Sequence, residues 1–170
     1  MKSIITVAAL VLTVNVTVAQ KKVKESEVPK AVVESFYQNF KGAKVEKWEK
    51  EKNGEYEAEF EIVRVNMDKA NSKKEEIESS ANFTSDGKLI QTETEMKVAD
   101  LPKAISEYVT KNYPAYKISE AAKIVDPAGV VSYEAEVEKG KEEMDLIFDV
   151  NGVFLKKEVK NDEDKDDDKK

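Results

Sequence analysis

Two stretches of the chain carry an apolar residue at every fourth position. The first runs from Val28 to Phe40, and the second runs from Leu101 to Tyr113. This spacing places apolar side chains along one stripe of an α-helix and polar side chains opposite. Each stretch has a proline at its second position, where the first turn of a helix loses little from a missing N–H. The pattern therefore predicts two amphipathic helices. Their apolar stripes are Val28, Val32, Phe36 and Phe40 in the first and Leu101, Ile105, Val109 and Tyr113 in the second.

After each helix the apolar spacing changes from four to two. Apolar residues alternate with glutamates from Tyr56 to Ile62, and the same alternation runs from Tyr133 to Glu138. Alternation is typical of a strand with one side on a core and the other in water. We expect first strands near residues 43–50 and 117–125, and third strands ending at residues 83 and 148. Fourth strands should follow at about 88–96 and 153–159.

The two halves of the chain repeat one another in order. Residues 28–32 match 101–105, residues 56–60 match 133–137, and residues 83–87 match 148–152. The last match contains Asp-Gly in one copy and Asn-Gly in the other, and both dipeptides favour tight hairpin turns. Three matches in the same order indicate an internal repeat. The predicted fold class is α+β, with two tandem units that each pack a helix on a four-stranded antiparallel meander sheet.

The second and third strands lie farther apart in the first copy. Phe60 precedes Phe83 by 23 positions, whereas the matching residues of the second copy are 11 positions apart. The 12 extra residues, around 64–76, predict a longer hairpin with a basic tip formed by Lys69, Lys73 and Lys74. An insertion confined to one copy of a repeat often carries function. The alternative is an insertion that is tolerated without a role.

Both ends of the chain differ from the repeat. Lys2, a mostly apolar run at 4–16 and small or β-branched residues at 17–19 have the order of a secretory signal peptide. The apolar run is too short for a membrane anchor. Residues 161–170 hold six acids, three lysines and no apolar residue, which predicts disorder. We therefore expect a signal peptide at 1–19, units at 20–97 and 98–159, and an acidic tail at 160–170.

Composition excludes several functions. The chain contains no histidine and no cysteine, which rules out a Ser–His–Asp triad, a thiolate nucleophile and a His-rich metal site. Paired carboxylates remain, but here they alternate with core residues on strands and should be solvated. We therefore predict no enzymatic activity and no cofactor. The net charge of −7 argues against nucleic acid and anionic membranes as partners, and we expect no membrane insertion after signal removal.

Several of these segments resemble a known family. In the first copy they are Val28-Pro29-Lys30-Ala31, Val45-Glu46-Lys47-Trp48, Tyr56-Glu57-Ala58-Glu59-Phe60, and Phe83 with Asp86-Gly87. In the second copy they are Leu101-Pro102-Lys103-Ala104-Ile105, Asn112-Tyr113-Pro114, Tyr133-Glu134-Ala135-Glu136, and Phe148-Asp149 with Asn151-Gly152. Over about residues 27–158 the chain resembles the PepSY-like, β-lactamase-inhibitor-like family of exported bacterial proteins. The matching motifs are short and mostly structural.

The resemblance implies tandem helix-and-sheet units whose sheets form one curved surface, and residence in the periplasm or on the outer surface. The related inhibitors bind a secreted enzyme through the open sheet face, and PepSY units are associated with the restraint of peptidases. No inhibitory residue can be matched to a position in this sequence. The related inhibitors also use disulfides, which a chain without cysteine cannot form.

Candidate binding residues come from three parts of the sequence. The acidic alternation supplies Glu57, Glu59, Glu134 and Glu136, which either recruit a basic partner or form a solvated face balanced by lysines on neighbouring strands. Trp48 shares strand parity with Lys44 and Lys50, so it is either an exposed anchor or, if a bulge shifts the parity, a core residue. Tyr116 is a weaker candidate of the same kind. The basic hairpin tip adds Lys69, Lys73 and Lys74.

We therefore predict a non-catalytic, periplasmic or secreted binding module. It would recognise an exported protein or peptide through an open sheet face. One version of this prediction is that it inhibits the protein it binds. The alternative is binding of a divalent cation, calcium, by the acidic face and tail. The tail alternates aspartates at 162, 164 and 166 but lacks the glycine and the closing glutamate of a calcium loop. The sequence leaves the oligomeric state open.

Overall fold

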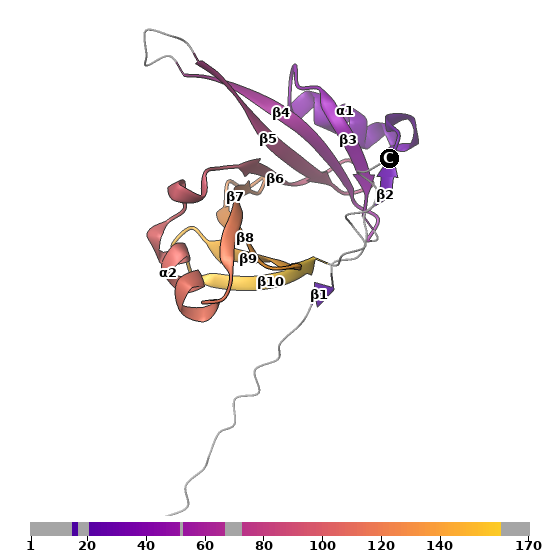
Figure 1. Ribbon diagram of the computed structural model, residues 1–170. Coiled ribbons are helices and arrows are strands. Elements are labelled where there is room, and N and C mark those ends of the chain that lie inside the picture. The colour runs from indigo at the N-terminus through magenta and orange to yellow at the C-terminus, as the bar shows by residue number, and fades with distance from the viewer. Residues whose placement is uncertain (1–14, 17–20, 52, 67–72, 161–170) are drawn as a thin grey trace, which may run out of the picture.

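The computed structural model describes residues 15–16, 21–51, 53–66 and 73–160 (Figure 1). Within them the fold is α+β, as predicted, with two α-helices and a ten-stranded sheet. The first half contains β1 (Asn15–Val16), β2 (Lys21–Val23), α1 (Lys30–Asn39), β3 (Val45–Lys50), β4 (Tyr56–Asn66), β5 (Lys73–Phe83) and β6 (Leu89–Glu95). The second contains α2 (Lys103–Asn112), β7 (Lys117–Val125), β8 (Val131–Lys139), β9 (Glu142–Asp149) and β10 (Phe154–Lys160). One-turn 3-10 helices, η1 (Glu25–Glu27) and η2 (Val98–Asp100), precede the two α-helices.

The two units share one continuous sheet. Its strand order is β1-β10-β9-β8-β7-β6-β5-β4-β3-β2, and every neighbouring pair is antiparallel except β1 with β10. The units join where β6 pairs with β7, from Thr92 opposite Val125 to Glu95 opposite Ala122. The curved surface implied by the resemblance is therefore a single sheet. The short strand β1 lies within the segment expected to be cleaved.

Both helices pack on the same side of this sheet. Phe36 of α1 lies in one core with Ala58 and Phe60 of β4, and Ile105 of α2 lies in another with Ala135 of β8. The pairing across β6 and β7 keeps these residues on one side, because paired residues in a sheet point the same way. In Figure 1 the helices accordingly lie on the outside of the bend, and the inner side carries no helix.

The longer hairpin predicted for the first unit is present. β4 and β5 are each 11 residues long and pair from Tyr56 opposite Phe83 as far as Asn66 opposite Lys73. The matching strands β8 and β9 have 9 and 8 residues. Of the three lysines predicted at the tip, Lys69 lies outside the described residues, whereas Lys73 and Lys74 begin β5.

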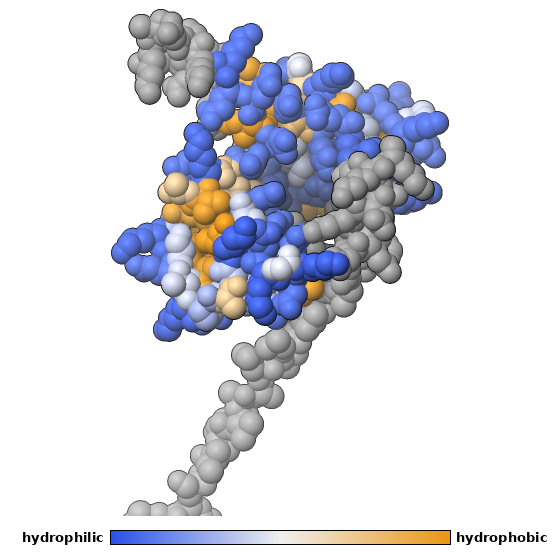
Figure 2. Space-filling view, viewed as in Figure 1, coloured by the Kyte–Doolittle hydropathy of each residue, from blue (hydrophilic) through white to orange (hydrophobic). Residues whose placement is uncertain are grey.

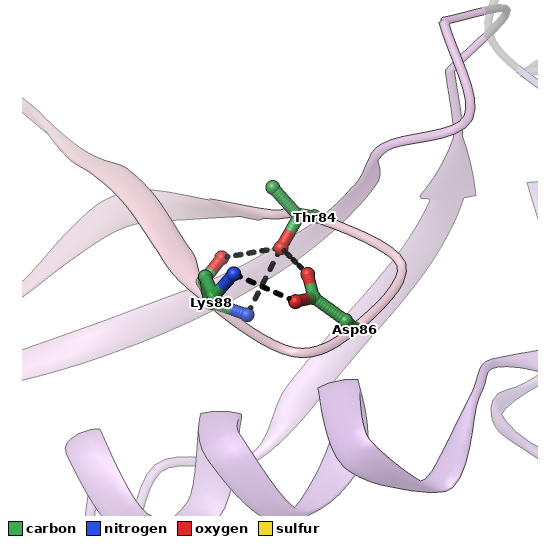
Figure 3. Close-up of polar contacts among 3 residues, drawn as sticks. All are labelled: Thr84, Asp86 and Lys88. Atoms are coloured by element: carbon green, nitrogen blue, oxygen red, sulfur yellow. Dashed lines mark hydrogen bonds and ion pairs between the residues drawn. The ribbon is translucent and has the colours of Figure 1, made fainter.

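The turn between the third and fourth strands of each unit lies close to the helix, with Gly87 next to Ala31 and Gly152 next to Ala104. In the first unit Thr84 Oγ1 accepts a hydrogen bond from the Lys88 backbone N–H at 3.0 Å, and Lys88 Nζ lies 2.9 Å from an Asp86 oxygen (Figure 3). In the second unit Asp149 Oδ1 takes the place of the threonine hydroxyl and accepts from the Val153 N–H at 2.8 Å. The same five-residue turn is thus closed by different side chains in the two copies.

Trp48 is a core residue, which is the second of the two placements that the sequence left open. Its side chain is 3% exposed, and its ring lies 5.7 Å from that of Phe36. A register shift between Val45 and Lys47 inserts one residue into β3 and reverses the alternation beyond it. The indole N–H donates to Glu25 Oε2 at 3.3 Å, which satisfies the polar atom of the buried ring. Trp48 therefore stabilises the first core and is not an exposed binding anchor.

Candidate functional site

The inner side of the sheet carries a row of carboxylates from both units, which we call the acidic face. Alternation on β4 and β8 places their glutamates on the side of the sheet away from the helices. The pairing of neighbouring strands extends this row through β5, β6 and β7. The members of the acidic face are Glu57, Glu59, Glu61, Glu78, Glu93, Glu95, Glu120, Glu134 and Glu136.

The acidic face is hollowed where the two units meet. A cleft of about 610 Å³ lies there, and eight of its thirteen lining residues are glutamates. They come from six consecutive strands, β3 to β8, so neither unit forms the cleft alone. Figure 2 shows the hollow between the two halves bordered mostly by hydrophilic residues. The lining glutamates are Glu46, Glu59, Glu61, Glu78, Glu93, Glu95, Glu120 and Glu134.

Register brings carboxylates directly opposite one another on the acidic face. Glu61 faces Glu78, and Glu136 faces both Glu120 and Asp145 on its neighbouring strands. Like charges at directly opposite positions destabilise a sheet by about 0.2–1 kcal/mol each. The pKa of the Glu61 carboxyl is raised by the nearby charge of Glu46 and then by that of Glu76. The free protein therefore holds a concentrated negative charge at some cost in stability.

A lysine partly balances one end of this charge. Lys47 Nζ lies 2.9 Å from Glu49 Oε1 and 3.1 Å from Glu59 Oε1. Burial alone would lower the pKa of Lys47, but hydrogen bonds to these two carboxylates outweigh it and raise the pKa. The sequence allowed the acidic residues to form a solvated face balanced by lysines on neighbouring strands. That arrangement is present at this end of β3 and β4. In the cleft, no lysine or arginine is among the lining residues described.

Glu57 lies on the acidic face in a half-buried position. Burial raises the pKa of its carboxyl, a hydrogen bond from Ser80 opposes the shift, and the charges of Glu59 and Glu49 add to it. A raised pKa in the folded state means that the charged form is disfavoured by folding. Glu57 therefore lowers stability at pH values above the ordinary carboxyl range.

Replacing Glu57 with glutamine should stabilise the free protein at neutral pH. Glutamine can still accept from Ser80 but carries no charge, and we expect a gain of about 0.5–1 kcal/mol because no charge has to be buried and the repulsion is relieved. The gain should vanish as the pH falls below the ordinary carboxyl pKa, where the unfolded wild-type chain is protonated too. Thermal unfolding at several pH values measures this. Glu34→Gln is the control, because Glu34 pairs with Lys30 at 3.1 Å on the outside of α1 and should show no gain.

The structure brings together four of the residues predicted to bind a partner. Glu57 and Glu59 of the first unit and Glu134 and Glu136 of the second all lie on the acidic face. Ser119 helps to orient Glu136, because its hydroxyl donates to Glu136 Oε1 at 2.9 Å. The acidic alternation on β4 and β8 is therefore the part of the sequence that located this surface.

The other predicted binding residues lie elsewhere. For Tyr116 the structure shows the core placement of the two that the sequence left open. Its ring packs against the second core, 5.9 Å from Tyr113, and its hydroxyl donates to Glu142. Lys74 is exposed at the far end of the long hairpin, opposite Val65. Lys73 pairs with Asn66 through the backbone, and its side chain lies outside the described residues.

Sequence analysis missed the middle of the acidic face. Glu93 and Glu95 come from β6, and Glu120 comes from β7. The alternation Thr92-Glu93-Thr94-Glu95 was a usable signal, because it repeats the period of two seen in β4. The pairing of β6 with β7, which places these residues between the two ladders, has no local sequence signal.

The described residues were also compared with the requirements of a metal site and of a membrane span. Among them, no group of three or more acidic side chains is arranged to hold a metal ion. The acidic face thus supplies no ligand set for the calcium alternative, and the tail at 161–170 lies outside the described residues. In this part of the chain neither helix has the length and hydrophobicity of a membrane span.

Comparisons with known proteins agree with this architecture. A family model described as "Putative beta-lactamase-inhibitor-like, PepSY-like" matches twice, over residues 14–72 and 68–156. No curated protein matches the sequence.

Several solved structures share the fold. A DUF2874 family protein from Bacteroides ovatus is 17% identical with a TM-score of 0.58, over 78% of this chain and 87% of that one. One of the "putative periplasmic proteins" from Bacteroides eggerthii is 14% identical with a TM-score of 0.57, over 78% and 88%. A BLIP-like protein from Bacteroides fragilis is 19% identical with a TM-score of 0.54, over 79% and 90%. With matches over most of its length, the chain belongs to the PepSY-like, β-lactamase-inhibitor-like family and consists of two tandem units.

Proposed function

We propose that the protein is a non-catalytic, periplasmic or secreted binding module that recognises a basic surface or segment of another exported protein through the acidic face. The observation that carries the proposal is the cleft between the units, with glutamates from six strands and no helix over it. Concave sheets of one charge attract partners of the opposite charge and raise their association rates. The predicted signal peptide and the relative named as periplasmic support an exported setting.

The electrostatic repulsion within the acidic face favours a binding role. Directly opposed carboxylates such as Glu61 and Glu78 destabilise the free protein, and lysine or arginine side chains from a partner would remove that penalty. A partner that binds only the folded state also stabilises it. Where the partner is an enzyme, the binding would restrain it, as the name of the family suggests.

Binding to the acidic face can be distinguished from attraction to overall charge. The probe is an oligolysine peptide, titrated by calorimetry at low salt. Replacing Glu95 and Glu120 with glutamine should weaken binding about 2–30-fold, because each removes an exposed charge–charge interaction worth about 0.2–1 kcal/mol. The control replaces Glu34 and Glu107, on the outside of the two helices, and leaves the same net charge. Equal weakening by both pairs of substitutions would contradict the proposal.

A further inference from the structure

The far part of the β4–β5 hairpin leaves the rest of the sheet. β4 pairs with all 11 residues of β5, but the pairing of β6 with β5 begins only at Ser79 opposite Thr94. Past that point the chain turns toward β7, where the Met96 backbone N–H donates to the Ala121 carbonyl at 2.9 Å. Figure 1 shows the hairpin diverging from β6. Residues 74–77 therefore form a strand edge with no further strand beside it among the described residues.

Two residues on this edge direct their backbone groups outward. Along a strand the N–H and C=O groups point alternately to one neighbour and to the other. The Thr84 N–H donates to the Lys88 carbonyl in the turn between β5 and β6, so the even-numbered residues of β5 face the β6 side. Lys74 and Glu76 thus point their backbone groups to the free edge, and neither pairs there with a described residue. Backbone groups left open in this way can bond to an added strand.

A groove follows the free edge between the two units. It has a volume of about 650 Å³, and Glu75, Glu76 and Ile77 of β5 all line it. Because side chains alternate between the two faces of a strand, three consecutive residues line one groove where the edge of the strand faces it. Met96 and Val125 join Ile77 as apolar lining residues. The groove therefore combines open backbone groups with an apolar surface.

The charged residues around the groove are mostly acidic. The acidic ones are Glu75, Glu76, Glu95 and Asp100, and the basic ones are Lys97 and Lys123. Lys97 Nζ lies 3.3 Å from Glu75 Oε1, which balances that carboxylate. Glu76 and Glu95 lie on the other side of the strands, toward the acidic face. A strand added here would meet apolar residues on its helix side and carboxylates on its opposite side.

We propose that the free edge of β5 receives an extended segment of the exported partner as an added antiparallel strand, in which apolar and basic residues alternate. The segment would continue the line of β6, and every strand from β2 to β10 pairs with its neighbours in the antiparallel sense. Its apolar side chains would pack on Ile77 and its basic side chains would lie beside Glu76. The inference rests on the proposed function for the charge of the partner and adds a second, backbone-paired site to it.

Antiparallel pairing fixes which backbone groups of the segment bond to β5. A residue directly opposite Glu76 exchanges hydrogen bonds with it and points its side chain to the same side of the sheet. That side carries the acidic face, so a basic residue occupies this position. The basic residues therefore bond to β5, whereas the apolar residues direct their backbone groups to the outer edge of the added strand.

Backbone methylation of a peptide tests this arrangement without altering the protein. The probe is a short acetylated peptide of alternating lysine and valine, titrated by calorimetry into the mature chain, residues 20–170. N-methylation at the lysines removes the donors that face β5 and should weaken binding about tenfold or more. N-methylation at the valines changes only the outer edge and should leave binding within about twofold of the unmethylated peptide. Equal weakening by the two methylated peptides would overturn the proposal.

Proline substitutions test the same edge from the side of the protein. Glu76→Pro removes an outward N–H, which an edge strand tolerates, and should weaken peptide binding about tenfold or more. Val63→Pro is the matched control, because Val63 stands opposite Glu76 and points its backbone groups to the other free edge of the hairpin. It should bind as wild type does, and Glu76→Gln, which loses only the charge, should bind about 2–5-fold more weakly. Wild-type binding by Glu76→Pro, or equal losses in both proline variants, would contradict strand addition.

A further substitution separates this proposal from the proposed function. Glu120 lines the cleft of the acidic face but not this groove. Peptide binding that is insensitive to lysine methylation but weakened by Glu120→Gln would overturn strand addition and leave the acidic face as the site. Binding lost on lysine methylation and unchanged in Glu120→Gln would support strand addition alone. A dimer of the mature chain in sedimentation, abolished by Glu76→Pro, would assign the edge to a second copy and overturn the proposal.

Discussion

Replacing Gly87 with alanine is expected to destabilise the protein by about 2–5 kcal/mol. Gly87 has a φ of 85°, which costs an alanine about 1–2 kcal/mol. A Cβ there would lie 2.5 Å from the backbone oxygen of Ala31, so the turn and α1 would have to separate. Overpacking of this kind costs about 1–3 kcal/mol more. Urea denaturation measures the change.

The matched control is Gly54→Ala in the turn between β3 and β4. Gly54 has a similar φ of 89°, but a Cβ there meets no atom within 4 Å. Gly54→Ala should lower the free energy of unfolding only by the conformational cost of about 1–2 kcal/mol. An equal loss for Gly54→Ala and Gly87→Ala would show that contact between turn and helix contributes nothing.

The second unit allows the contact itself to be relieved. A Cβ on Gly152 would lie 2.7 Å from the Ala104 Cβ, a side-chain atom that can be removed. Ala104→Gly should therefore recover part of the stability lost by Gly152→Ala. Ala31→Gly should not rescue Gly87→Ala, because the nearest obstruction there is backbone. Gly129, with a φ of 81° and no neighbour within 4 Å, is the control in this unit.

Phe36→Ala is expected to cost about 3–5 kcal/mol, as is usual for a phenylalanine in a closed core. The Phe36 side chain is fully buried, and its ring centre lies 5.1 Å from that of Phe60 and 5.7 Å from that of Trp48. Removing it leaves a cavity beneath α1 and deprives those rings of edge contacts. Chemical denaturation monitored by Trp48 fluorescence reports both the stability and the local packing.

The repeat supplies the control for this substitution. Val109 occupies the matching position on α2 and is 3% exposed, but it is smaller and lies in a different core. Val109→Ala should cost about 2 kcal/mol, from the loss of two methyl groups and the small cavity left behind. A loss for Phe36→Ala no larger than that for Val109→Ala would contradict the central position assigned to the Phe36 ring.

The helices and the meander were predictable because each follows a strong local pattern. The four-residue spacing from Val28 and from Leu101 identified α1 and α2, and the turns at Gly87 and Gly152 identified the hairpins. Both patterns arise from contacts between residues close in sequence. They also occur twice, so that each copy supported the interpretation of the other.

The sequence could not decide between the two placements of Trp48 and Tyr116 for a physical reason. Strand parity is a local rule, and a single inserted residue between Val45 and Lys47 reverses it without changing the composition of β3. Tyr116 stands just before β7, where no alternation has yet begun, and it packs against the second core. A bulge of one residue decides which side of the sheet Trp48 faces, and the start of β7 decides where Tyr116 lies. Neither feature has a distinctive sequence.

The acidic face was only partly predictable for a different reason. Glu57 and Glu134 are 77 positions apart, and what unites them is the pairing of β6 with β7. That pairing is a long-range contact between two units. The sequence therefore indicated two acidic ladders, and only the fold joins them around one cleft.

The most direct measurement places a photo-crosslinking amino acid at either of two positions and irradiates cells that export the protein. Position 95 lines the cleft, and position 107 lies exposed on the outer side of α2. A recognition surface on the inner side of the sheet predicts an adduct with an exported protein from position 95, lost when Glu120 is replaced by lysine, and none from position 107. Adducts from position 107 alone, or the same adducts from both positions, would contradict it.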